Sequence, residues 1–73
     1  MDYIRQEFRV HLLNTSGIIS AKALAQEFSD VLHHIETLCG SDGREMAIVR
    51  TKMEEACFFA KKALASREYN QLR

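Results

Sequence analysis

The feature that most limits the fold of this chain is a stretch, Gly43 to Ala65, with hydrophobic residues on more than one side of a predicted helix. One set recurs at steps of three and four and forms a single face: Met46, Val49, Met53, Ala56, Cys57, Ala60 and Leu64. A second set falls on other faces: Ala47, Ile48, Phe58, Phe59 and Ala63. Such a helix must bury several sides, so in a chain of 73 residues we expect burial between subunits as well as within one.

A second helix is predicted over residues 18–38, before the helix at 43–65. Its hydrophobic stripe consists of Leu24, Phe28, Val31, Leu32, Ile35 and Leu38. In the turn between the two helices, Gly40 suits the left-handed conformation that ends a helix. Asp42, with Glu45 three residues later, predicts a capping box at the start of the next helix. Because the connection is short, the two helices should lie antiparallel.

The segments outside this hairpin are short. Residues 3–11 are predicted to form a short helix with Ile4 and Phe8 on one side, which needs tertiary support at this length. Three consecutive polar residues are candidate N-caps for the first long helix: Asn14, Thr15 and Ser16. The polar tail, 66–73, is predicted to fray. The expected fold is all-α: a single domain over 1–73, an antiparallel helical hairpin with a short N-terminal helix, assembled into a compact homo-oligomer.

Composition also favours self-association. A domain of this size exposes much of its surface and usually needs disulfides, a metal or other copies of itself. Cys39 and Cys57 are too few for a disulfide scaffold, and the charged first residues do not form a signal peptide. We therefore expect reduced thiols in a cytoplasmic protein. No segment approaches the roughly 20 hydrophobic residues needed to span a bilayer, so no membrane partner is expected.

The charges are balanced overall but unevenly placed. The formal net charge is zero, which gives no general attraction to membranes or long nucleic acids. Residues 1–42 are acidic on balance and residues 43–73 are basic. This asymmetry suits an antiparallel hairpin and head-to-tail subunit contacts, and it leaves basic side chains for a small anionic ligand.

The motifs of common enzymes are missing, so no enzymatic activity and no cofactor are expected. The chain has no Gly-rich phosphate loop, no nucleophile elbow and no His-Glu-x-x-His pair. His33 and His34 are adjacent and diverge on a helix, which is unsuitable for shared metal ligation even with Cys39 nearby. Glu54 and Glu55 diverge for the same reason, and are expected to pair with cations on the same helix.

Two of those pairs can be named, and one lysine has two possible roles. Glu54 is expected to pair with Arg50, and Glu55 either with Lys52 or with residues near Lys62 across subunits. Lys22 is the only cation of the helix at 18–38 and would lie near its first turn, where the helix dipole disfavours a cation. It could strengthen phosphate binding at the helix N-terminus, or be an ordinary solvated lysine.

The segment from Arg44 to Ala60, with its run Thr-Lys-Met-Glu-Glu-Ala-Cys-Phe-Phe-Ala, resembles a family of small phage proteins. These share a helical hairpin domain and act as sponges for cyclic oligonucleotides; one branch counters the CBASS defence and a related one counters Thoeris. The segment Phe8-Arg9-Val10-His11 corresponds to the family's Phe-x-Tyr-His segment. The resemblance covers roughly residues 8–65.

The resemblance implies a homohexamer that sequesters cyclic dinucleotides such as cGAMP in pockets at subunit junctions. Some members also bind cyclic trinucleotides at separate sites. The protein would hide the messenger from host CBASS immunity, in the cytoplasm of the infected bacterium, without cleaving it. Position by position, Lys22 would hold a phosphate and the segment from Phe8 to His11 would contact the base. Val10 departs from the family, because it replaces an aromatic residue that stacks on the base.

Other residues near the ends and middle of the second long helix complete the candidate ligand-binding set. That set is Phe8, Arg9, His11, Lys22, Arg44, Lys52 and Arg67. The role of the matching motif residues, ligand binding or assembly, is left open: Thr51, Lys52, Glu54 and Glu55.

Two alternatives from other classes are kept. The first is an RNA-binding hairpin dimer with a basic stripe of Arg50, Lys61 and Lys62, although the interleaved acids oppose strong binding to a nucleic-acid backbone. The second is a protein-binding inhibitor that uses Phe58 and Phe59 in a helix-in-groove contact.

Overall fold

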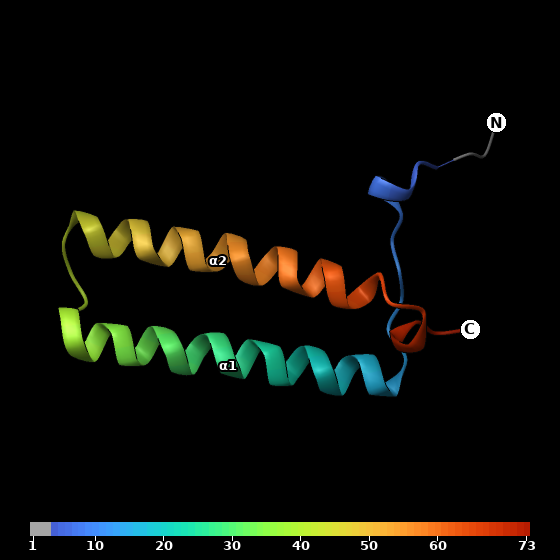
Figure 1. The fold of residues 1–73 in the computed structure, drawn as a ribbon, viewed down its shortest axis with the longest axis horizontal. Helices are drawn as coiled ribbons and strands as arrows, with labels where there is room; N and C mark the ends of the chain where they lie inside the picture. Colours follow the sequence, from blue (N-terminus) through green and yellow to red (C-terminus); the bar gives the residue numbers. More distant parts are fainter. Residues whose placement is uncertain (1–3) are drawn as a thin grey trace.

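The fold is a flat helical hairpin, seen in a computed structural model that describes residues 4–73. Four elements follow in order: the 3-10 turn η1 (Gln6–Phe8), helix α1 (Thr15–Cys39), helix α2 (Arg44–Ala65) and the 3-10 turn η2 (Glu68–Asn70). The two long helices run antiparallel along a molecule of 49 × 28 × 11 Å, and the segment before α1 and the tail after α2 both lie opposite the turn that joins the helices (Figure 1). The predicted all-helical hairpin is confirmed.

Helix α1 begins three residues earlier than the predicted start at 18. The reason is Asn14, one of the three candidate N-caps, whose side-chain Oδ1 accepts a hydrogen bond from the Gly17 N–H at 2.8 Å. Gly17 is therefore inside the helix and buried. At the other end Gly40 terminates α1 with a φ of 83°, as predicted, and its N–H donates to the Glu36 carbonyl at 2.9 Å.

The start of α2 corrects the predicted capping box. The N-cap is Gly43, with a φ of 100° and no side-chain capping bond, so Asp42 and Glu45 do not cap this helix. A φ in this range is easily adopted by glycine and strained for aspartate, which places the boundary at Gly43. Helix α2 thus spans Arg44–Ala65, one residue shorter than predicted.

The segment before α1, residues 4–13, is mostly extended, and we call it the leader. A helix was expected over 3–11, but the structure has only the single turn η1, at Gln6–Phe8; Tyr3 lies outside the described residues. The turn is not extended because it lacks the packing that so short a helix needs: the side chain of Phe8 is 72% exposed, and Ile4 is also exposed.

The tail is ordered onto the start of α1, contrary to the expected fraying of 66–73. The Asn14 N–H donates to the Asn70 carbonyl at 2.9 Å, and the Leu72 N–H donates to the Leu12 carbonyl at 2.8 Å. Between these bonds Leu13 and Gln71 form an antiparallel bridge. These non-local bonds close the open end of the hairpin, because the tail spans from the end of α2 to the start of α1.

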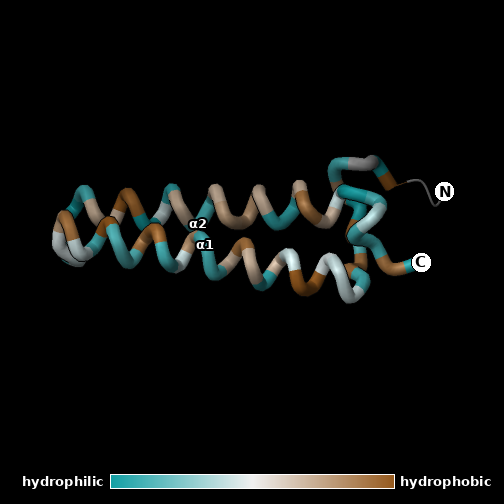
Figure 2. Tube along the Cα trace, turned by 60° about the horizontal axis from the view of Figure 1, so that its bottom comes forward, coloured by the Kyte–Doolittle hydropathy of each residue, from teal (hydrophilic) through white to brown (hydrophobic). Residues whose placement is uncertain are grey.

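A single copy buries very little. Met46, at 4% exposure, is the one large hydrophobic residue that is buried among those described. The chain exposes 6185 Å², whereas a globular monomer of 8.4 kDa would expose about 4600 Å². Figure 2 shows hydrophobic residues on the outer edges of both helices as well as between them. Within residues 4–73, neither long helix has the hydrophobicity required of a membrane span.

Candidate functional site

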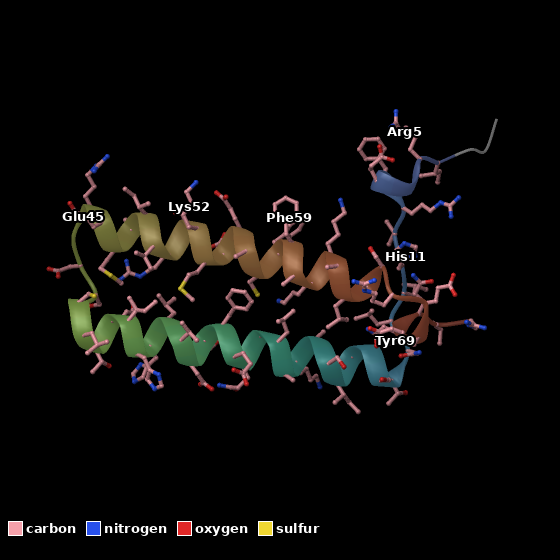
Figure 3. The ribbon with its side chains drawn as sticks, in the orientation of Figure 1. Arg5, His11, Glu45, Lys52, Phe59 and Tyr69 are labelled. Atoms are coloured by element: carbon pink, nitrogen blue, oxygen red, sulfur yellow. The ribbon has the colours of Figure 1, made fainter. Side chains whose placement is uncertain are left out.

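Two of the predicted ligand-binding residues, Arg9 and His11, lie together at the end of the molecule where the leader meets the tail. Arg9, Val10 and His11 line a shallow hollow of about 450 Å³ with Ile4 and Gln71. His11 is half-buried beside the tail (Figure 3), and the Arg9 side chain donates to the Ile4 carbonyl at 3.4 Å. The hollow therefore presents two nitrogen-rich side chains next to an amide.

Phe8 ends η1 and is followed directly by Arg9 of this hollow, and a local ion pair joins Glu7 of η1 to Arg5, the residue before η1. The Arg5 guanidinium lies 2.6 Å from the Glu7 carboxylate, and both side chains are exposed. A hydrogen bond from the Glu7 backbone and the bond from Arg5 lower the pKa of the Glu7 carboxyl, with a smaller effect from Lys62. The leader therefore keeps a negative charge beside its cations, and Phe8 is its exposed aromatic ring.

Lys22 does not lie near the helix start, which corrects the expected position. Helix α1 begins at Thr15, so Lys22 follows about two turns later. The helix dipole acts within the first turn, and it does not reach this side chain. Lys22 is exposed. The phosphate-binding role of Lys22 therefore rests on the family resemblance rather than on the helix N-terminus.

The remaining candidates are spread along α2. Arg44 is its first residue and Arg67 follows its last turn, so about 33 Å of helix lies between them. Lys52 lies between the two and, like Phe59, points away from α1 (Figure 3). Its ammonium is 3.9 Å from the Glu55 carboxylate, the exposed pair that the sequence predicted. One chain therefore does not bring all the candidates to one place.

A second hollow, of about 510 Å³, runs between the two long helices. It is open and mainly hydrophobic, and its lining includes Phe28, Leu32, Met53, Cys57 and Phe58. The rings of Phe58 and Phe59 meet edge to face at 5.4 Å, and their residues are 64% and 61% exposed. This groove is a hydrophobic face that one chain leaves uncovered.

A comparison with protein families decides the relationship of the chain. The model of the Acb2/Tad1 hairpin domain matches residues 2–65. The chain belongs to this family. No curated protein and no solved structure shows a significant match. Membership of the Acb2/Tad1 hairpin family is consistent with an anti-defence protein that captures cyclic oligonucleotides, as the resemblance implied.

Metal ligation has no support within residues 4–73 of this Acb2/Tad1 hairpin. His33 and His34 are both exposed, with ring centroids 6.4 Å apart and planes tilted by 50°. Among the described residues, no group of three His, Cys, Asp or Glu side chains could hold a metal ion. Cys39 and Cys57 are free thiols.

Sequence reasoning did not identify the residues that hold the two ends of the hairpin. At the turn, Arg50 bonds the Glu36 carboxylate at 3.1 and 3.2 Å, and also the Ser41 carbonyl. It does so instead of forming the predicted pair with Glu54. At the open end the residues are Asn14 and Asn70. The sequence signal for them was an asparagine before the first long helix and another after the second.

Proposed function

We propose that this protein binds and sequesters cyclic oligonucleotide second messengers and so blocks CBASS immunity in the infected host cell. The ligands are cyclic dinucleotides such as cGAMP, with cyclic trinucleotides as a second class. The protein performs no chemistry on them, and it needs no cofactor. Its effect comes from tight binding and slow release of the messenger.

The observation that carries the proposal is the match of residues 2–65 to the Acb2/Tad1 hairpin domain. The match includes the hairpin and also the leader, with Phe8, Arg9 and His11. Cyclic dinucleotides have two phosphates and two flat bases, and the candidate residues are cations and rings that suit these groups. Because Val10 replaces an aromatic residue, Phe8 and His11 are the rings available to stack on a base.

The binding pockets are proposed to lie where copies of the chain meet, as in a homohexamer. Arg44 and Arg67 are at opposite ends of α2 and do not meet within one chain. Phe58 and Phe59 are exposed on one copy, and closed symmetric assembly is the usual way to cover such a face. A junction can also enclose a ligand, whereas the hollows of one copy are open.

The test is isothermal titration calorimetry against a panel of cyclic di- and trinucleotides. We expect saturable heat from at least one ligand, and chromatography of the released ligand should recover it unchanged. Lys22→Ala should weaken binding of a cyclic dinucleotide about tenfold or more, as expected for loss of a charge-assisted phosphate contact. Lys62→Ala, an exposed lysine outside the candidate set, is the matched control.

Absence of heat from every ligand would reject the sponge proposal. Unchanged affinity in Lys22→Ala would reject only the role of Lys22. The exposed Phe58 and Phe59 favour the protein-binding inhibitor as the second candidate, and loss of the homo-oligomer on contact with a host protein would support it. Strongly salt-dependent binding of duplex RNA would instead support the RNA-binding dimer.

A further inference from the structure

The tail contains a segment, Glu68 to Leu72, that lies beyond the residues that match the family; we call it the C-terminal clasp. Its anchor is Asn70, which is polar and yet only 4% exposed. The Asn70 amide donates to the Leu64 carbonyl at 3.0 Å, and the Gln71 amide donates to the Ala65 carbonyl at 3.0 Å. Both acceptors are carbonyls of the last turn of α2, which have no helical partner four residues later, although the Leu64 carbonyl also accepts from the Arg67 N–H at 3.2 Å. The clasp is thereby fixed to α2.

The clasp is also fixed to the start of α1. The Asn14 amide donates to the Tyr69 carbonyl at 2.9 Å and to the Gln71 carbonyl at 3.2 Å. The Asn70 backbone rests directly on Gly17: a Cβ at Gly17 would lie 2.5 Å from the Asn70 carbonyl oxygen. The clasp therefore joins the two helices at the end where the leader begins.

The leader depends on this clasp for its place. Among the backbone hydrogen bonds of the described residues, the bond from Leu72 to Leu12 is the one that ties residues 4–13 to another element. Gln71 lines the same hollow as Arg9 and His11. A leader with exposed hydrophobic residues and only one local turn has little packing of its own to hold it.

We propose that the C-terminal clasp is a positioning element for the ligand, with Asn70 as its positioning residue. It holds Arg9 and His11 where they meet the cyclic oligonucleotide, so that the leader is ordered before binding. Without the clasp, binding would have to order the leader, and affinity would fall by that entropic cost. This inference rests on the proposed function and adds residues outside the family's hairpin domain.

Gly17→Ala tests the clasp without weakening α1. Alanine favours a helix more than glycine does, yet its Cβ would displace the Asn70 carbonyl and would also lie 3.1 Å from the side chain of Leu13, the bridge partner of Gln71 in the clasp. We expect an unchanged helical circular dichroism signal, faster hydrogen exchange at the Asn14 and Leu72 amides, and about tenfold weaker binding of the cyclic oligonucleotide. Ser16→Ala, an exposed change in the same helical turn, should leave exchange and affinity unchanged.

A disulfide rescue separates positioning from a general effect on stability. Leu13 and Gln71 are paired between two flanking backbone bonds, a geometry in which Cα atoms lie about 4.5 Å apart, within the range of a disulfide. The test combines Asn70→Ala with Leu13→Cys and Gln71→Cys, and replaces Cys39 and Cys57 by serine. The reduced protein should bind weakly, and oxidation should restore most of the lost affinity.

The outcomes distinguish this inference from the proposed function. If the unmodified protein binds no cyclic oligonucleotide, the proposed function fails and the ligand role of the clasp fails with it. If the unmodified protein binds while Gly17→Ala binds equally well despite faster exchange, only the clasp's role is overturned. Unchanged hydrogen exchange at the Asn14 and Leu72 amides would show that the clasp does not pack on Gly17. Failure of oxidation to restore ligand binding would show that Asn70 is not a positioning residue.

Discussion

At the scale of the residue, Asn14 stabilises more of the fold than its place in a polar loop suggests. Its side-chain oxygen caps α1 through the Gly17 N–H, and its side-chain nitrogen donates to the Tyr69 and Gln71 carbonyls. The sequence predicted the first role, since the cap is a local pattern of three residues. It did not predict the second, because those partners are more than fifty residues away in the chain.

Two substitutions at this position separate its roles. Asn14→Asp keeps the oxygen that caps α1 and adds a charge that the helix N-terminus favours, but it cannot donate to the clasp. We expect the helix content to be retained and the Leu72 amide to exchange faster. Asn14→Ala loses both roles and should cost at least about 1 kcal/mol more in the free energy of unfolding than Asn14→Asp. Urea unfolding and hydrogen exchange measure the two effects; equal behaviour of the two variants would contradict this division.

At the scale of the element, the turn is held by a contact between helices rather than by a capping box. Hydrophobic periodicity and Gly40 were sufficient to predict the hairpin, since both are local signals. The partner of Arg50 was not predictable in the same way. Glu54 was available one turn away, but Glu36 and the Ser41 carbonyl offer a half-buried site with several acceptors. Which acceptor Arg50 binds therefore depends on how α1 and α2 pack together, which is not a local property of the sequence.

Arg50→Met is expected to destabilise the hairpin by about 1–2 kcal/mol, because Glu36 and the Ser41 carbonyl lose a charged donor. Lys52→Met is the control, since the Lys52–Glu55 pair is exposed and should contribute less than about 1 kcal/mol. Chemical denaturation at constant protein concentration compares them. If Lys52→Met lowered the free energy of unfolding more than Arg50→Met did, the Arg50 contact would not be what holds the turn.

At the scale of the whole molecule, the hydrophobic surface is too extensive for one copy to cover. The exposed area exceeds that of a globular monomer of this mass by about 1600 Å². The sequence predicted this from hydrophobic residues on several faces of one helix. It could not place the candidate ligand residues relative to each other: Arg9 and His11 share a hollow with Gln71 of the tail, and Arg44 and Arg67 are separated by the length of α2.

The mass in solution tests the assembly. Light scattering should give a multiple of the 8.4 kDa chain, and Phe59→Ser should lower that mass, since Phe59 is exposed and points away from α1. Glu27→Ser, an exposed change on α1, should not alter it. A stable, folded single chain would contradict both the assembly and the proposed binding pockets at the junctions between its copies.

The position of the C-terminal tail has a practical consequence for labelling. The tail ends at the side of the hairpin where the leader meets the clasp (Figure 1). A fluorescent reporter or affinity tag fused after Arg73 would therefore crowd the hollow formed by Arg9, His11 and Gln71. The exposed loop at Ser41 and Asp42 lies at the opposite end of the hairpin, so a probe attached there would leave this hollow unobstructed.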